Sequence, residues 1–302
     1  MDRSPSRRDA LRWAAATLCS PARAQEASFT TGVKVVNVLV TVRDKQGQFV
    51  RDLSKTDFVL EEDGRPQLIR YFSPQAGEPL TLGLLIDVSG SQRSVLAEQR
   101  RAGRQFLNKV LRKDDRAFLV RFDRTPELSP SLDLPEPQEN SAGSQGTALY
   151  DSIVFAAAKI NGQAGRKALV VLSDGYDTSS AATLAAAIEA AQRGDALIYT
   201  IRFLDRAVFA FEIPPSQGGS PVPREGRKAL ERISHATGGA FFDLTAAQDL
   251  DKIYSRIEDE LRNQYSLGFT PGKGRSGYRR IRVSVRRKGV TVAARDGYYL
   301  TE

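Results

Sequence analysis

Residues 82–91 read LGLLIDVSGS and decide the fold. Four of the first five residues are large and apolar, as in a short strand that is buried on both faces of a sheet. The run then ends in Asp87, Ser89 and Ser91, three oxygen-bearing side chains at alternate positions. A polar turn of this kind lies where open α/β sheets bind ligands, just beyond the carboxyl end of a strand.

Outward from this stretch, short apolar runs alternate with helical patterns up to residue 262. Strands are predicted by the apolar runs at 117–122, 168–172, 197–203 and 240–242. Helices are predicted by apolar spacing at 92–112, 147–160, 181–193, 225–237 and 247–262. The alternation predicts a doubly wound, mostly parallel sheet with helices on both faces, a Rossmann-like α/β domain at 80–262.

Both flanks of this domain have β character instead. Strand patterns are predicted in the N-terminal flank at 33–43 and 58–72, before a linker at 73–79, and in the C-terminal flank at 264–269, 278–287 and 289–300. Neither flank alone is large enough to bury a stable hydrophobic core. We expect residues 25–79 and 263–302 to pair in one small β-sandwich-like domain, with two separate β appendages as the alternative.

The N-terminus has the features of an export signal. Arg7 and Arg8 precede a short, weakly apolar stretch, and Ala22-Arg23-Ala24 supplies small residues at the positions that a signal peptidase reads. Residues 1–24 are therefore predicted to be a twin-arginine signal peptide, and the protein to be periplasmic or extracellular. A disordered basic N-terminus is the alternative. Cys19 is the only cysteine, so the mature chain would hold no disulfide and no cysteine zinc site.

Several kinds of function lack support in the sequence. The chain has 302 residues, 41% of them hydrophobic, and no apolar run approaches the roughly 18 residues that span a bilayer. Phosphate-binding glycine motifs are absent, and His235 is the only histidine, so no nucleophile–base pair is visible and no enzyme is predicted. His235 is expected to have a structural role at a helix end.

Two further polar corners accompany the one at 87–91. Ser173-Asp174-Gly175 follows the strand at 168–172, and Gly143 to Thr147 opens a helix. Carboxylates and hydroxyls without cysteine or histidine are hard ligands, which suit Mg²⁺ best, or Mn²⁺ or Ca²⁺. Because few of these ligands are anionic, the ion would keep an open position for a carboxylate from another molecule. The simpler explanation is that Ser91 and Thr147 cap helices and that Asp174 belongs to a turn.

The same residues resemble a known family. DxSxS at 87–91, Thr147 in GTALYD and SDG at 173–175 resemble the metal-ion-dependent adhesion site (MIDAS) of von Willebrand factor type A (VWA) domains. The flanks at 40–72 and 278–300 are similar to those of a bacterial group of secreted VWA-related proteins. The resemblance implies that the hydroxyls of Ser89, Ser91 and Thr147 bind the metal directly, and that Asp87 and Asp174 bind it directly or through water.

The expected function follows from this resemblance. We expect an exported adhesion module that captures an acidic side chain of a protein partner, with no nucleic acid and no transmembrane segment; the oligomeric state stays open. A structural or assembly module of the cell envelope, whose β flanks bind, and a metal-dependent hydrolase are the alternatives. The arginines at 279, 280, 282, 286 and 287 are interpreted as a solvated strand face, and loops 124–146 and 204–226 as borders of the metal face.

Overall fold

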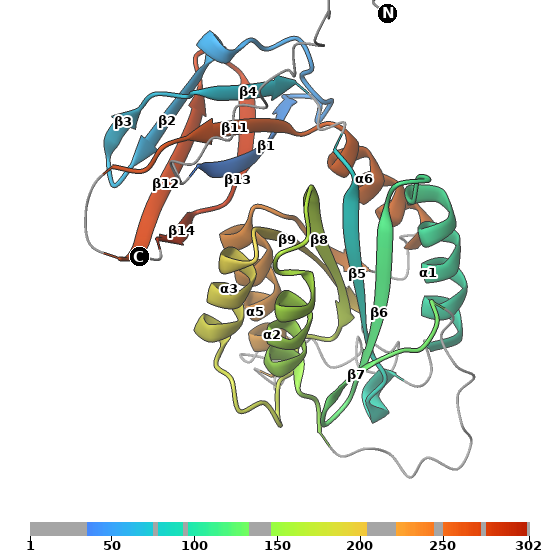
Figure 1. The fold of residues 1–302 in the computed structure, drawn as a ribbon. Coiled ribbons are helices and arrows are strands. Elements are labelled where there is room, and N and C mark those ends of the chain that lie inside the picture. Colours follow the sequence, from blue (N-terminus) through green and yellow to red (C-terminus); the bar gives the residue numbers. More distant parts are fainter. Residues whose placement is uncertain are drawn as a thin grey trace, which may run out of the picture. The chain divides into compact units, whose positions relative to one another are not determined.

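The protein is described by a computed structural model that covers residues 35–74, 78–92, 96–132, 146–203, 222–244, 250–272 and 276–300. The described residues contain one six-stranded sheet with helices and two four-stranded antiparallel sheets (Figure 1). The predicted signal peptide and most of loop 204–226 lie outside the described residues. None of the helices in the described part of the chain has the length and apolar character needed to cross a bilayer.

The six-stranded sheet has the predicted doubly wound topology. Its strands are β5 (Leu80–Asp87), β6 (Arg116–Phe122), β7 (Pro126–Leu128), β8 (Arg166–Ser173), β9 (Ala196–Phe203) and β10 (Phe241–Leu244). They lie in the order β10-β9-β8-β5-β6-β7, and every pair is parallel except β6 and β7. Counted along the chain from β5, this is the order 3-2-1-4-5-6, which reverses between β5 and β8. In open α/β sheets, ligands bind at such a reversal, beyond the carboxyl ends of the strands.

Helices cover both faces of this sheet. They are α1 (Leu96–Val110), α2 (Leu149–Ile160), α3 (Leu184–Arg193), α5 (Val222–Thr237) and α6 (Leu250–Arg262). Leu84 of β5 belongs to the core with α1 and α6, whereas its neighbour Leu85 belongs to the core with α2, α3 and α5. Within the predicted helix at 92–112, the structure describes α1 from Leu96 to Val110, and Gln92 belongs to a 3₁₀ turn, η2 (Gly90–Gln92).

The two flanks share both antiparallel sheets. Their strands are β1 (Val36–Asp44), β2 (Phe58–Glu62), β3 (Arg65–Gln67), β4 (Tyr71–Pro74), β11 (Tyr265–Phe269), β12 (Gly277–Val285), β13 (Val290–Ala294) and β14 (Gly297–Leu300), with the short 3₁₀ turn η1 (Lys55–Asp57) before β2. One sheet has the order β13-β1-β11-β4 and the other β14-β12-β2-β3. Strands from the two ends of the chain therefore pair with each other, while the predicted domain limits at residues 24, 79 and 262 stay predictions.

Two strand assignments differ from the sequence patterns. The run at 58–72 does not continue in one sheet, because β4 pairs with β11 and not with β3. The single strand predicted at 289–300 is broken between β13 and β14, which lie in different sheets. At the break the Arg295 side chain is buried and donates to the Asn37 carbonyl and to Asp195, so the chain turns inward there.

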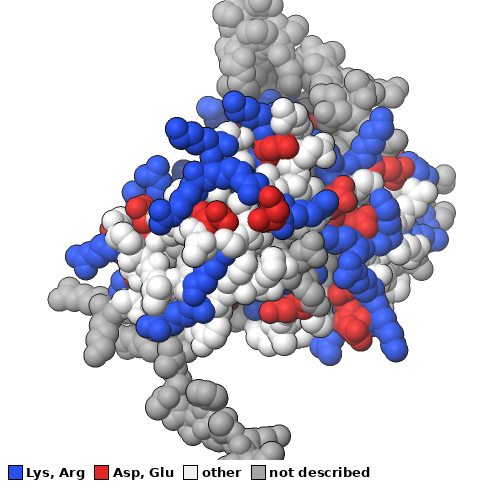
Figure 2. All heavy atoms as spheres, turned by 90° about the horizontal axis from the view of Figure 1, so that it is seen from above, with Lys and Arg blue, Asp and Glu red and all other residues white. Residues whose placement is uncertain are grey.

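Arg280 and Arg282 of β12 lie on a solvated face, as predicted, whereas the prediction is wrong for Arg279. The Arg279 side chain is 15% exposed, lies on the same side of the strand as Ile281 and is 3.7 Å from the buried carboxylate of Glu62. Ile281 is buried, whereas Arg280 and Arg282 on either side of it are exposed. Arg287, just beyond the strand, forms a two-point ion pair with Asp52 at 2.8 and 3.1 Å. Figure 2 shows Lys and Arg side chains interleaved with acidic ones on one face of the molecule, which is the pattern of an ordinary charged surface.

Candidate metal centre

Asp87 is the last residue of β5, and its side chain is fully buried. The Ser89 backbone N–H donates to Asp87 Oδ1 at 3.0 Å, and the Ser173 hydroxyl donates to Oδ2 at 2.7 Å. Ser173 is the last residue of β8, the strand beside β5. Both carboxylate oxygens are thus held by groups at the carboxyl ends of β5 and β8, the two strands that border the switch point of the sheet.

Asp174 lies at the matching position of the neighbouring strand. It follows β8 directly and is 4% exposed. The Tyr176 backbone N–H donates to its Oδ1 at 3.1 Å, and the Gln92 side-chain amide donates to its Oδ2 at 3.3 Å. The structure therefore brings a second buried carboxylate to the same edge of the sheet.

Thr147 does not cap its helix. The N-cap of α2 is Ala148, and no side chain of the cap residue bonds the first turn. Instead, Asp177 and Ser180 accept hydrogen bonds from the backbone N–H groups of Tyr150 and Asp151. The capping explanation for Thr147 is therefore wrong, and side chains of the loop after β8 cap α2 instead.

Hydrogen bonds connect the segments that meet at this edge of the sheet. The backbone N–H groups of Val88, Ala148 and Thr178 donate to the carbonyls of Phe122, Asp123 and Thr147, respectively. The Ser173 hydroxyl donates to Asp87. The Thr178 hydroxyl also accepts the Thr147 backbone N–H at 2.9 Å. Asp87, Thr147 and Ser173, one residue from each of the three polar corners, are thus connected by hydrogen bonds.

The side chains of four of the five predicted ligands are described, and all four are buried. Ser89 is 3% and Thr147 is 6% exposed. Ser91 lies in η2, and its side chain is outside the described part. The five positions come from the ends of β5 and β8 and the start of α2, so the fold places all of them at the carboxyl edge of the sheet (Figure 1).

Electrostatics at this edge favour a cation. Burial raises the pKa of Asp87 to about 7, and the negative charge of Asp174 adds to the rise, while hydrogen bonds from Ser89 and Ser173 oppose it. In the described ranges, no three His, Cys, Asp or Glu side chains are grouped as metal ligands. A site here must therefore combine the two carboxylates with hydroxyls, a donor set that fits a hard divalent cation.

A close backbone contact holds Asp174 against α5. Gly175 has φ +89°, and a Cβ atom added there would lie 2.4 Å from the carbonyl oxygen of Gly226, near the start of α5. Only glycine combines this backbone conformation with such an approach. The loop after β8 and the beginning of α5 are consequently packed backbone to backbone beside the site.

Gly175→Ala is expected to lower the free energy of unfolding by more than the about 1–2 kcal/mol that a left-handed alanine costs by itself. The matched control is Gly162→Ala, since Gly162 has φ +77° and open space around its Cα. Urea denaturation of both variants measures the difference. Equal losses would show that the contact with Gly226 is not tight.

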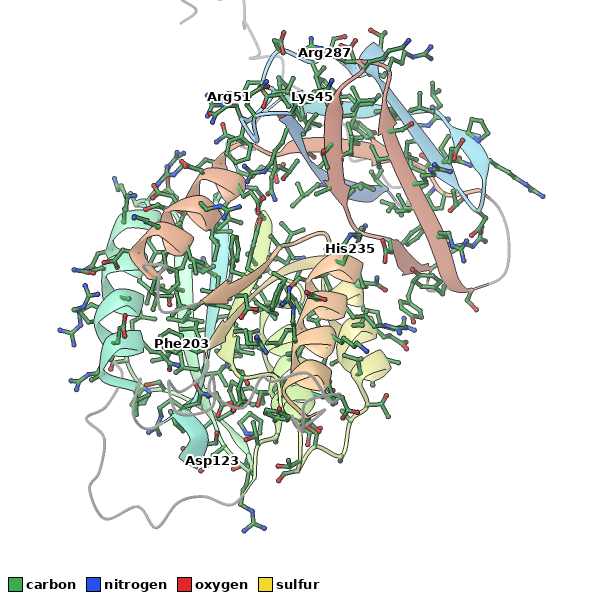
Figure 3. The ribbon with its side chains drawn as sticks, turned by 180° about the vertical axis from the view of Figure 1, so that it is seen from behind. Lys45, Arg51, Asp123, Phe203, His235 and Arg287 are labelled. Atoms are coloured by element: carbon green, nitrogen blue, oxygen red, sulfur yellow. The ribbon has the colours of Figure 1, made fainter. Side chains whose placement is uncertain are left out.

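Other residues that stood out in the sequence lie away from this edge. His235 is in the last turn of α5, exposed, with Nδ1 3.8 Å from Asp296 Oδ1. Figure 3 shows His235 at the end of α5 next to the sandwich, far from Asp123 at the carboxyl edge. Of the loops predicted to border the site, 124–146 contains the edge strand β7, and residues 204–221 lie outside the described part.

Three residues that contact the two carboxylates or support their partners are not among the predicted site residues. They are Ser173, in the SDG motif, and Gln92 and Gln99, which fall within the predicted helix at 92–112. Gln99 does carry a detectable pattern, because it falls at helical spacing with the apolar Leu96 and Phe106 on the buried face of α1.

No family model and no curated relative matches the chain. Among solved structures, the von Willebrand factor type A protein from Catenulispora acidiphila is 13% identical, with 87% of this chain and 73% of that chain covered and a TM-score of 0.44. BatB from Bacteroides thetaiotaomicron is 15% identical, with 60% and 97% covered and a TM-score of 0.43. An aerotolerance-related membrane protein from Bacteroides fragilis is 16% identical, with 60% and 98% covered and a TM-score of 0.44.

Similarities at this level carry no weight for function, and the fold is assigned from the chain itself. Three features decide it: the strand order, the helices on both faces of the sheet, and the polar corners at the ends of β5 and β8 and the start of α2. All three agree with the resemblance that DxSxS, Thr147 and SDG indicate. The six-stranded sheet and the helices that cover it have the fold of a von Willebrand factor type A domain.

Proposed function

We propose that the protein is an exported, non-enzymatic binding module that holds a divalent cation, in first place Mg²⁺, and captures an acidic side chain of a protein partner. The cation ligands are Asp87, Ser89, Ser91, Thr147 and Asp174. The observation that carries the proposal is the pair of buried carboxylates at the carboxyl ends of adjacent strands, at the switch point of the sheet. Two such carboxylates repel each other unless one of them is protonated or a positive charge lies between them.

The chain's own residues prepare this site. The Ser89 N–H and the Ser173 hydroxyl fix both oxygens of Asp87, and Gln92 and Tyr176 fix those of Asp174. Only these two ligands are anionic, since Ser89, Ser91 and Thr147 are neutral. When bound, the cation supplies a coordination position for an oxygen from outside the chain. A carboxylate of the partner matches both the position and the remaining positive charge.

Thr147→Val is expected to weaken Mn²⁺ binding at least about tenfold, whereas Thr147→Ser is expected to bind nearly as well as the original protein. Valine keeps the shape of threonine but lacks the hydroxyl, and serine keeps the hydroxyl. Isothermal titration of Mn²⁺ into the three proteins measures the affinities. If the valine and serine variants bind alike, the Thr147 hydroxyl is not a ligand.

Capture of a partner tests the remainder of the proposal. The protein, without its predicted signal, is immobilised and exposed to envelope extract in Mg²⁺ or in EDTA, and the captured proteins are identified. A partner that is retained in Mg²⁺, released by EDTA and absent from Thr147→Val supports the proposal. A partner retained in all three cases would assign binding to the β flanks, as in a structural envelope module. Metal-dependent turnover of a substrate panel would instead identify a hydrolase.

A further inference from the structure

Two buried glutamines lie directly behind the candidate metal centre. Gln92 of η2 is 1% exposed, and Gln99 of α1 is fully buried. The Gln92 amide nitrogen donates to Asp174 Oδ2 at 3.3 Å and to the Phe203 carbonyl at 3.2 Å. The Gln99 amide nitrogen donates in turn to Gln92 Oε1 at 3.0 Å. The pair thus connects Asp174 with the carboxyl end of β9 and with the buried face of α1.

The chemistry of the neighbours fixes the orientation of the Gln92 amide. A carboxylate and a backbone carbonyl are both acceptors, so the nitrogen of Gln92 must face them. Its oxygen then faces Gln99, which must present its own nitrogen. The Gln99 oxygen has no hydrogen-bond partner among the described atoms. Burying that oxygen costs stability, whereas leucine at position 99 would fill the same apolar face without this cost.

We infer that Gln92 is a positioning residue for the metal centre, and that Gln99 holds Gln92 in place. The inference rests on the proposed function as far as the metal is concerned. A neutral amide can orient Asp174 without neutralising it, so the carboxylate keeps its full charge for the cation. A lysine or arginine in the same place would orient the carboxylate but compete with the metal for it. Hydrogen-bond partners of metal ligands commonly act in this way.

Substitution of the amide by a hydrocarbon tests this role. Gln92→Leu is expected to lower Mn²⁺ affinity about 10- to 100-fold, and Gln99→Leu, which leaves Gln92 in place, is expected to lower it less. The matched control is Gln192→Leu. Gln192 of α3 is 3% exposed, donates to the Ala236 carbonyl at 2.8 Å and also has a buried oxygen without a partner in the described part. Its replacement removes an equivalent amide but should leave Mn²⁺ affinity unchanged.

A second measurement needs no metal. In EDTA, the loss in melting temperature caused by Gln92→Leu is compared in the original protein and in an Asp174→Ala background. If the amide holds the carboxylate, most of the loss disappears when the carboxylate is absent, because residues in direct contact are coupled. The loss caused by Gln192→Leu is expected to be the same in both backgrounds.

The outcomes separate this inference from the proposed function. If the original protein binds no Mn²⁺, the proposed function fails, and the measurement in EDTA still decides whether Gln92 positions Asp174. If Mn²⁺ binds but Gln92→Leu and Gln192→Leu both retain full affinity, the inference is overturned and the proposed function stands. Additive melting-temperature losses for Gln92→Leu and Asp174→Ala would also overturn it.

Discussion

Asp87→Asn is expected to abolish divalent-cation binding and to make the metal-free protein more stable at neutral and higher pH. Burial and the charge of Asp174 raise the pKa of Asp87 from 3.8 to about 7 in the folded protein. The folded protein therefore keeps a proton that the unfolded chain has already released. The contribution of Asp87 to stability is complete below about pH 4 and is lost as the pH rises through about 7, a change of about 4 kcal/mol.

Asparagine has the shape of aspartate but no charge, so the variant does not lose stability as the pH rises through about 7. Urea unfolding in EDTA, from pH 5 to pH 8, should show the variant gaining stability over the original protein as the pH rises. Asp52→Asn is the control, because the hydrogen bonds and charge of Arg287 lower the pKa of Asp52 and place its titration below this range. A stability difference that does not change with pH would mean that Asp87 is ionised in the metal-free protein throughout.

Phe269→Ala is expected to cost about 3–5 kcal/mol of stability and to loosen strands at the other end of the chain. Phe269 of β11 is fully buried in the core of the sandwich, and its backbone pairs with Val36 of β1. The cavity left by alanine would therefore lie between strands of both flanks. The free energy of unfolding of the N-terminal strands should fall together with that of the C-terminal ones.

Hydrogen exchange measures this coupling strand by strand. The amides of β1 and β2 are expected to exchange faster in Phe269→Ala, while those of β5 and β8 change much less. Phe155→Ala is the control, because Phe155 of α2 is 37% exposed and its truncation leaves no buried cavity. If β1 and β2 kept their protection, the two flanks would be independent structures, as in the alternative of two separate appendages.

The fold could be predicted well where one physical preference dominates. The β5 strand is apolar on both faces, and only a sheet covered on both sides buries it, so LGLLI predicts the class of the domain. The alternation around Ile281 predicts a half-buried strand for a similar reason. The convergence of Asp87, Thr147 and Asp174 was also predictable, because parallel strands bring their carboxyl ends to one edge.

Features that depend on contacts between distant segments could not be predicted. The break between β13 and β14 follows from the burial of Arg295 against Asn37 and Asp195, far away in sequence. Thr147 has the sequence of a helix cap, but Asp177 and Ser180 from the next loop cap α2 instead. Gln92 looks like a polar surface residue until the fold places Asp174 and the Phe203 carbonyl beside it. The spacing places Gln99 on the buried face of its helix, but its contact with Gln92 follows only from the fold.

The pairing of the two flanks has a consequence for synthesis on the ribosome. Val40 of β1 pairs with Tyr265 of β11, 225 residues later, so at about 5–20 residues per second β1 waits about 11–45 s for this partner. During that time Val38, Val40 and Val42, which the sandwich finally buries, have no neighbouring strand from the C-terminal flank. The α/β domain is translated within the same interval. The sandwich therefore closes last, and a chain that stops within the α/β domain cannot close it.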